Sequence, residues 1–338
     1  MNFRDILQKL ARKEALEKTE MESAMEEIVV GKAQDADIEE FLVLLRQKGE
    51  TADEITAAAT VMRRHAVGLS KRFPDLLDTC GTGADHSRTV NVSTLASIVA
   101  AAAGIRVAKH GNRAVSGVCG SADLLELLGV KIELEPDQIQ ACLEKTGFAF
   151  FFAPRFHPAI RFAMPARKRI KEKTLFNLLG PLSNPAGARF QLVGVYDKKL
   201  TKIFAEVLRE LGTERALIVH GSDGMDEITT CGETFVYELL DGRLIEHVLH
   251  PKDFGLPTAK PAELQCESKE SAKESALAVL SGEPGPKSDL AAMNAAAAIY
   301  VAGKSKSLKG GLSLAKDILS SKKALQKLEE IVAVSNSA

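Results

Sequence analysis

Apolar residues in the first part of the chain recur at spacings of three and four, which is the period of an amphipathic helix. The residues that set this period include Phe3, Ile6, Leu7, Leu10, Met21, Met25, Ile28 and Val29. The run Thr51-Ala52-Asp53-Glu54 has the capping-box pattern, which predicts a helix that begins there and continues to about His65. We therefore expect a small helical domain over residues 1–70.

Beyond Pro74 the pattern changes to short apolar runs that alternate with helical stretches, which is typical of an α/β fold. The runs that we interpret as strands are residues 75–78, 105–108, 131–134, 148–152, 190–195 and 216–219. The stretches that we interpret as helices are residues 91–103, 136–146, 200–211, 269–280, 288–302 and 308–332. These elements predict a large α/β domain over residues 75–334.

The composition narrows the class of protein. The net charge of −1 leaves no excess of positive charge for binding nucleic acid or anionic lipid. The cysteines are scattered without a Cys-x-x-Cys pair, which favours a reducing cytoplasm over a disulfide framework or a zinc site. The N-terminus lacks the apolar stretch of a signal peptide, and the longest nearly apolar run, residues 95–105, is shorter than the ~20 residues that span a bilayer. We expect a cytoplasmic protein with no nucleic-acid or membrane partner.

A glycine-containing turn lies between a predicted strand and a predicted helix. The turn reads Asp78-Thr79-Cys80-Gly81-Thr82-Gly83-Ala84-Asp85, and the helix begins with Asn91-Val92-Ser93-Thr94. Glycines let a backbone approach a phosphate closely, and a helix N-terminus attracts negative charge. The pattern fits neither the dinucleotide fingerprint nor the P-loop. We interpret it as an anion site, with a tight turn that binds no ligand as the alternative.

A second polar cluster, Lys109-His110-Gly111-Asn112-Arg113, follows the next predicted strand, with Gly120 and Ser121 beyond it. In parallel α/β sheets the loops after consecutive strands meet at one edge, so this cluster should lie close to the glycine turn. Lysine and arginine supply charge, and asparagine and serine supply oriented hydrogen bonds, which suits a phosphorylated sugar. A solvated surface is the alternative interpretation.

Two further segments carry candidate chemistry. Asp226 and Glu227 lie on a glycine-bearing loop, and such carboxylates suit a Mg²⁺ that also contacts substrate phosphates, although acidic pairs on loops are often only solvated. The segment from Phe151 to Pro158 leads to Arg161 and Arg167. Apolar walls and a guanidinium could hold a flat molecule that bears a carboxylate, whereas core aromatics and solvated arginines are the alternative.

Taken in order, these segments resemble the anthranilate phosphoribosyltransferases, enzymes of tryptophan biosynthesis in the class that shares a fold with the pyrimidine nucleoside phosphorylases. The resemblance spans nearly the whole chain. The motifs that carry it are Gly81-Thr82-Gly83 with Asp85, Asn91-Val92-Ser93-Thr94, Lys109-His110-Gly111-Asn112-Arg113, Gly120-Ser121-Ala122-Asp123, His157-Pro158-Ala159, Phe176-Asn177-Leu178-Leu179-Gly180-Pro181 with Asn184-Pro185, and Asp226-Glu227.

The resemblance implies a reaction and an architecture. The phosphoribosyl group of phosphoribosyl pyrophosphate would pass to anthranilate, giving N-(5-phosphoribosyl)anthranilate and pyrophosphate with Mg²⁺ bound, the second step from chorismate to tryptophan. The small helical domain would be hinged to a large α/β domain with a central, mainly parallel sheet, and helices within about 157–185 would complete the small domain. A homodimer through the small domain is also implied. Positioning and charge stabilisation suffice for this displacement, so no covalent catalytic residue is expected.

The resemblance also implies the residues of the site. Those expected to bind substrate are Gly81, Gly83, Asp85, Ser87, Thr89, Asn91, Ser93, Thr94, Lys109, His110, Asn112, Ser121, His157, Arg167 and Pro181. Asn112 and Arg167 should face anthranilate. The Mg²⁺ should be held by Ser93, Asp226 and Glu227.

The chain departs from the family pattern in two places. Ala84 replaces a usual glycine, at a cost of about 1 kcal/mol if position 84 requires a positive φ. His86-Ser87-Arg88 then follows, where Arg88 either adds a cation near the pyrophosphate or points into water. Phe156 stands where many relatives carry histidine or tyrosine. Two other functions stay open on sequence grounds: a nucleoside phosphorylase, whose anion loop normally differs, and a nucleic-acid-binding relative, for which a basic face would be expected.

Overall fold

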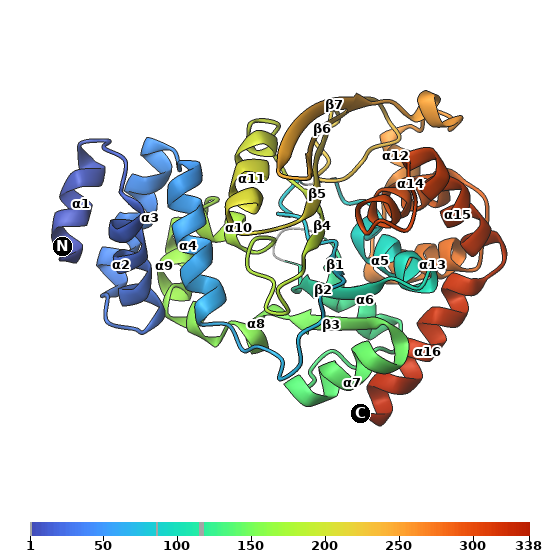
Figure 1. The fold of residues 1–338 in the computed structure, drawn as a ribbon, viewed down its shortest axis with the longest axis horizontal. Coiled ribbons are helices and arrows are strands. Elements are labelled where there is room, and N and C mark those ends of the chain that lie inside the picture. The colour runs from blue at the N-terminus through green and yellow to red at the C-terminus, as the bar shows by residue number, and fades with distance from the viewer. Residues whose placement is uncertain (1, 86, 115–117) are drawn as a thin grey trace.

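The computed structural model of the chain describes residues 2–85, 87–114 and 118–338. Four helices form a lobe at one end of the molecule, beside a larger body built around a sheet (Figure 1). The helices of this lobe are α1 (Phe3–Ala11), α2 (Lys18–Val29), α3 (Asp35–Lys48) and α4 (Ala52–Arg64). The predicted capping box is present, because Thr51 Oγ1 accepts from the Glu54 amide at 3.2 Å and Glu54 Oε2 accepts from the Thr51 amide at 2.8 Å.

A seven-stranded sheet, in the order β3-β2-β1-β4-β5-β6-β7, forms the centre of the body. The strands are β1 (Leu76–Asp78), β2 (Arg106–Gly111), β3 (Phe148–Phe152), β4 (Phe190–Gly194), β5 (Arg215–Gly221), β6 (Thr234–Leu240) and β7 (Arg243–Leu249). The first five strands are parallel and the last two pairings are antiparallel. The expected α/β class with a mainly parallel sheet is therefore confirmed. The chain first builds β1, β2 and β3 to one side and then returns to place β4 against β1, so the strand order reverses between β1 and β4, where open α/β sheets bind ligands.

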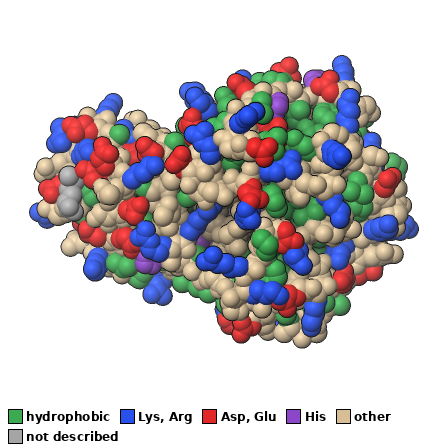
Figure 2. All heavy atoms as spheres, in the orientation of Figure 1, with side chains coloured by type: hydrophobic (Ala, Val, Ile, Leu, Met, Phe, Trp, Pro, Cys, Tyr) green, Lys and Arg blue, Asp and Glu red, His purple; other side chains and the backbone are tan. Residues whose placement is uncertain are grey.

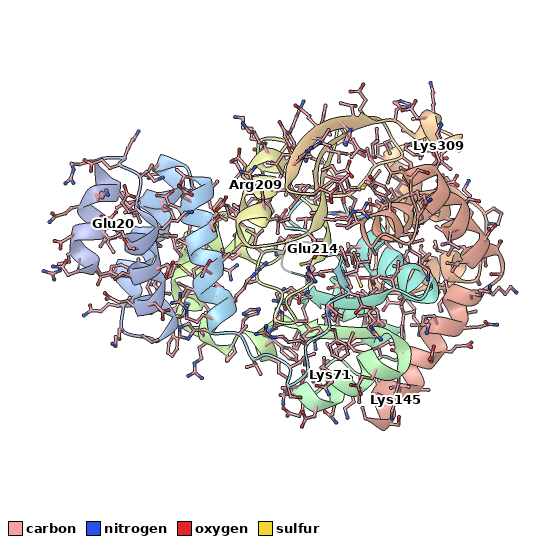
Figure 3. The ribbon with its side chains drawn as sticks, viewed as in Figure 1. Glu20, Lys71, Lys145, Arg209, Glu214 and Lys309 are labelled. Atoms are coloured by element: carbon pink, nitrogen blue, oxygen red, sulfur yellow. The ribbon has the colours of Figure 1, made fainter. Side chains whose placement is uncertain are left out.

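Helices cover both faces of the sheet (Figure 1). On one face, side chains of alternate strand positions join a core with α5 (Val92–Ala102) and α14 (Pro286–Val301). The other helices of this face are α6 (Ser121–Leu127), α12 (Pro261–Leu264), α13 (Lys269–Leu280), α15 (Leu308–Ser320) and α16 (Lys323–Ser337). Charged side chains such as Lys145 and Lys309 lie at the periphery of the body (Figure 3). Among the helices of the described chain, none is both long and apolar enough to cross a membrane.

The opposite face packs against α7 (Pro136–Thr146) and α11 (Lys199–Glu210). The segment between β3 and β4 forms α8 (Ala153–Phe156), α9 (Met164–Ile170) and α10 (Leu175–Leu179), with a 3₁₀ turn at Pro158–Phe162; a second 3₁₀ turn is Pro251–Phe254. α9 packs against α3, and α10 packs against α4. Arg169 Nε of α9 donates to Glu39 Oε2 of α3 at 2.5 Å.

Three features of these elements differ from the sequence-based expectations. Residues 131–134 form no strand: they are irregular and lead into α7, and the strand that pairs with the outer side of β2 is β3. The helix expected over 308–332 is broken by Lys322, which has φ 60° and separates α15 from α16. The β6–β7 hairpin was not anticipated. Its signal is the Asp241-Gly242 turn, where both residues have positive φ as tight hairpin turns require.

Candidate active site

A cavity of about 1300 Å³ lies where the loops after β1, β2 and β5 meet the segment that connects α9 to α10. It therefore lies between the helical lobe and the carboxyl edge of the parallel strands, next to the point where the strand order reverses. In Figure 2 the molecule narrows between its two parts, and Lys and Arg side chains lie along this boundary. One wall of the cavity contains the glycine turn and the start of α5, which we call the anion-binding wall after its predicted role, and the other wall is aromatic.

The glycine turn after β1 is built around the side chain of Asp226. The Gly83 amide donates to Asp226 Oδ2 at 2.7 Å. A Cβ atom at Gly81 would lie 2.7 Å from the same oxygen, and one at Gly194 would collide with the Asp226 backbone. These two glycines are therefore required by the approach of Asp226, whereas Gly83, with φ 65° and open space around it, serves the turn itself.

The acidic pair is held close to the N-terminus of α5. Glu227 Oε1 accepts from the Ser93 amide at 3.1 Å. Burial, followed by the charge of Asp85, raises the pKa of Asp226 to about 8, and burial together with Asp226 raises the pKa of Glu227 well above its usual value. Burial and the repulsion between neighbouring carboxylates both disfavour the charged forms of this pair. The described residues form no group of three or more potential metal ligands, and two carboxylates with one hydroxyl fit Mg²⁺, which keeps waters and shares its ligands with phosphates.

Lys109 is buried beside this wall, with 1% of its surface exposed. Its Nζ donates to the Thr79 carbonyl and to Ser93 Oγ, both at 3.2 Å. The sequence placed Lys109 and His110 on a loop after residue 108, but both lie in β2, because the pairing with β3 continues to Gly111. A strand fixes the ammonium more rigidly than a loop would.

Two predicted residues lie at the start of α5. Asn91 precedes the helix, and its side-chain amide donates to the Cys119 carbonyl at 2.7 Å, which joins the start of α5 to the loop after β2. Thr94 is fully buried and does not border the cavity. A direct contact between Thr94 and substrate stays a prediction, made for a residue that lies behind Ser93 in the first turn of α5.

The aromatic wall contains two neutral histidines. The rings of His110 and His157 lie 5.1 Å apart, and His110 Nδ1 is 3.0 Å from the Gly180 carbonyl. Burial lowers the pKa of His110 to about 3 and that of His157 to about 4. Arg167 lies over the Phe176 ring at 5.4 Å, and burial lowers its pKa. A guanidinium on an apolar, uncharged wall suits an aromatic carboxylate.

The structure shows the backbone conformation and the position of the residues that depart from the family pattern. Ala84 has φ 60° and Arg88 has φ 53°, so both occupy the left-handed region that favours glycine. Both border the cavity, while His86 lies outside the described residues. Phe156 is buried with its ring 4.9 Å from that of Phe151 and belongs to the core, so it forms no part of the cavity wall.

The remaining predicted residues all border the cavity. They are Gly81, Gly83, Asp85, Ser87, Thr89, Asn91, Ser93, Lys109, His110, Asn112, Ser121, His157, Arg167, Pro181, Asp226 and Glu227. Sequence reasoning missed Arg46 of α3 and Lys173, which border it as well. The basic run from Arg167 to Lys173 was the available signal for Lys173, whereas only the packing of the lobe brings Arg46 to the cavity.

Comparisons with known proteins agree with this architecture. Residues 73–325 match the glycosyl transferase family, a/b domain, and residues 4–66 match the glycosyl transferase family, helical bundle domain. The chain is 45% identical over 329 residues to the anthranilate phosphoribosyltransferase of Alkaliphilus metalliredigens, covering 97% of each. It is 47% identical over 327 residues to that of Moorella thermoacetica, covering 97% of this chain and 96% of the relative.

Solved structures show the same fold throughout. The anthranilate phosphoribosyltransferase of Thermus thermophilus superposes with a TM-score of 0.92 at 42% identity, covering 98% of this chain and 99% of that one. The Saccharomyces cerevisiae enzyme in complex with PRPP and Mg superposes with a TM-score of 0.91 at 28% identity, covering 99% of this chain and 98% of that one. With both domain families matched and relatives of this identity along its whole length, the chain belongs to the anthranilate phosphoribosyltransferase family.

Proposed function

We propose that this protein transfers the phosphoribosyl group of phosphoribosyl pyrophosphate (PRPP) to the nitrogen of anthranilate, releasing pyrophosphate, in the second step of tryptophan biosynthesis from chorismate. One observation carries the proposal: the glycine turn, the N-terminus of α5 and the pair Asp226 and Glu227 form one wall of a cavity whose other wall is aromatic and bears Arg167. A polyanionic sugar donor and a flat aromatic acid require these two different surfaces in one enclosure.

The anion-binding wall receives PRPP. Backbone amides of the glycine turn and the positive end of α5 bind phosphate oxygens, and Lys109 adds a fixed positive charge. Hydroxyl and amide side chains complete the hydrogen bonds to the sugar and its phosphates; they are Ser87, Thr89, Asn91, Ser93 and Ser121. Asp85, with Gly81 and Gly83 of the glycine turn, contributes to the same binding surface.

Asp226, Glu227 and Ser93 would hold Mg²⁺, which supplies positive charge to the pyrophosphate. The raised pKa values of both carboxylates support this assignment, because a bound cation would offset the burial and the repulsion that raise them. The relatives include a structure described with PRPP and Mg. The protein's own contribution is to fix the carboxylates through the Gly83 and Ser93 amides.

Anthranilate binds the aromatic wall. Arg167 and Asn112 bind and orient its carboxylate, while His110, His157 and Pro181 pack against its ring. The amino group of an aromatic amine is unprotonated at neutral pH, and both histidines are neutral, so orientation rather than proton abstraction by a strong base brings the nitrogen to the anomeric carbon.

We further infer a cytoplasmic homodimer that associates through the small domain, and a small domain that α9 and α10 complete. The cysteines of the chain are all free thiols, which supports a reducing compartment. The packing of α9 on α3, including the Arg169–Glu39 ion pair, supports the assignment of this segment to the small domain.

The fluorescence of anthranilate tests the function. We expect it to fall when the protein, PRPP and Mg²⁺ are combined, and to stay constant when any one of them is omitted. The double variant Asp226→Asn/Glu227→Gln should lose most of the Mg²⁺ dependence along with activity. Full activity in this variant would refute the metal assignment, and turnover of thymidine with phosphate but not of anthranilate would refute the reaction.

A further inference from the structure

Lys173 borders the cavity from the short segment between α9 and α10. Its Nζ lies 3.5 Å from the centroid of the Tyr196 ring, in a cation–π contact. The ring holds the ammonium in place and leaves its charge unneutralised. The side chain is half-buried, and the neighbouring Glu172 pairs with Arg46, which ties this segment to the helical lobe.

Tyr196 is itself joined to the glycine turn. Its backbone amide donates to Thr82 Oγ1 at 3.1 Å, and the Thr82 amide donates to the Gly194 carbonyl at 2.9 Å. The ammonium of Lys173 is therefore anchored beside the turn that faces the phosphates. Burial lowers the pKa of Lys173, while the charges of Asp85, Asp197 and Asp226 act in the opposite direction, so the ammonium lies within electrostatic reach of these carboxylates.

Three of the other cations that border the cavity already have partners. Lys109 is hydrogen-bonded inside the wall to Thr79 and Ser93. Arg113 pairs with Glu126, and Arg46 pairs with Glu172. Lys173 combines a position on the cavity, a neighbouring anion-binding turn and a contact that leaves its three N–H donors available.

We propose that Lys173 binds the pyrophosphate group of PRPP and stabilises it as it leaves, with the Tyr196 ring positioning the ammonium. This inference rests on the proposed function and adds a residue to it. In the reaction the lone pair of the anthranilate nitrogen forms the new bond to the anomeric carbon. The electron pair of the broken carbon–oxygen bond leaves with pyrophosphate, and the nitrogen releases a proton to water. A cation beside the departing oxygen stabilises the charge that develops there.

The test compares Lys173→Met with the wild type in steady-state kinetics and in calorimetric titration with magnesium pyrophosphate. We expect the KM for PRPP and the Kd for pyrophosphate to rise about tenfold or more, as for the loss of a charged hydrogen bond, while the KM for anthranilate stays within about twofold. Lys173→Arg should stay within about threefold of the wild type, because arginine keeps the charge and stacks on rings. Tyr196→Leu should weaken pyrophosphate binding less than Lys173→Met does.

The matched control is Lys198→Met, because Lys198 Nζ lies 3.4 Å from the Phe235 ring centroid in the same kind of contact but does not border the cavity. The KM for PRPP, the KM for anthranilate and the Kd for pyrophosphate should not change in this variant. An unchanged Kd for pyrophosphate in Lys173→Met, or equal rises in both KM values, would overturn the inference. Lys173→Gln replaces Lys173→Met if the latter melts below the wild type. A wild type that binds pyrophosphate but does not consume anthranilate would refute the proposed function, and the pyrophosphate titration would still decide the role of Lys173.

Discussion

At the scale of single residues, Ala84 adopts a backbone conformation that its own side chain disfavours. Its φ of 60° lies in the left-handed region, where a Cβ atom costs about 1 kcal/mol relative to glycine. We expect Ala84→Gly to raise the free energy of unfolding by about 1 kcal/mol, measured by urea denaturation and circular dichroism. Ala103→Gly, at φ −76°, should lower it by about 0.5 to 1 kcal/mol. A destabilised Ala84→Gly variant would show that the strain is absent.

The two buried histidines of the aromatic wall predict how stability depends on pH. In the unfolded chain each takes up a proton near the ordinary histidine pKa of 6.5, but in the folded protein only at about 3 for His110 and about 4 for His157. The contribution of the two histidines to the free energy of unfolding is therefore complete above pH 6.5. It is lost as the pH falls toward the pKa values that they have in the folded protein. When the pH falls from about 7.5 to 5.5, each histidine should lower the free energy of unfolding by about 1.4 kcal/mol.

Urea denaturation at the two pH values checks this dependence. The double variant His110→Gln/His157→Gln removes both titrating groups and should show a correspondingly smaller loss of stability over the same interval. If the wild type and the double variant lose equal amounts, protonation of these histidines does not govern the acid sensitivity.

At the scale of elements, α14 holds the loop that carries the acidic pair. Asn294 of α14 is fully buried, accepts from the Ile228 amide at 2.9 Å and donates to the Ile228 carbonyl at 2.8 Å. Asn294→Leu leaves both backbone groups unpaired, so we expect a loss of about 2 to 4 kcal/mol in unfolding free energy and a higher Mg²⁺ concentration for half-maximal activity. The control is Asn336→Ala, which removes an exposed amide that is hydrogen-bonded to the Gly129 and Val332 carbonyls. It should change neither the free energy of unfolding nor the Mg²⁺ concentration for half-maximal activity. If Asn294→Leu needs the same Mg²⁺ concentration as the wild type, α14 does not position the loop that carries Asp226 and Glu227.

The elements also show which features could be read locally. Helix α7 was predicted over the residues where it occurs, because Pro136 begins it and the turn at Gly147 ends it. Strand pairing is not local: the run 131–134 alternates charged and apolar residues as a half-buried strand does, yet it joins no sheet, whereas β3 pairs with β2. Lys109 lies inside β2 because β2 pairs with β3 as far as Gly111. The sequence pattern alone had placed Lys109 on the loop that follows the strand.

At the scale of the whole molecule, one apolar core joins the helical lobe to the body. Ile55 of α4 and Phe41 of α3 belong to the same buried cluster as Val193 of β4 and Phe204 of α11. Arg63 of α4 adds a hydrogen bond of 2.7 Å to the Leu182 carbonyl. We therefore expect a single transition in differential scanning calorimetry, with equal calorimetric and van't Hoff enthalpies. Two separate transitions would show that the lobe and the body unfold independently.

The sequence by itself determined the helical lobe, the α/β class and the glycine turn between β1 and α5, because glycine and capping patterns act over a few neighbouring residues. The resemblance to a known family supplied the residues predicted for the site. Only the tertiary structure decided that Gly81 and Gly194 make room for Asp226, that Thr94 is buried away from the cavity, and that Lys173 is held on Tyr196 beside the turn. These contacts join residues that lie far apart in the chain, and such contacts depend on strand order and packing that no local pattern encodes.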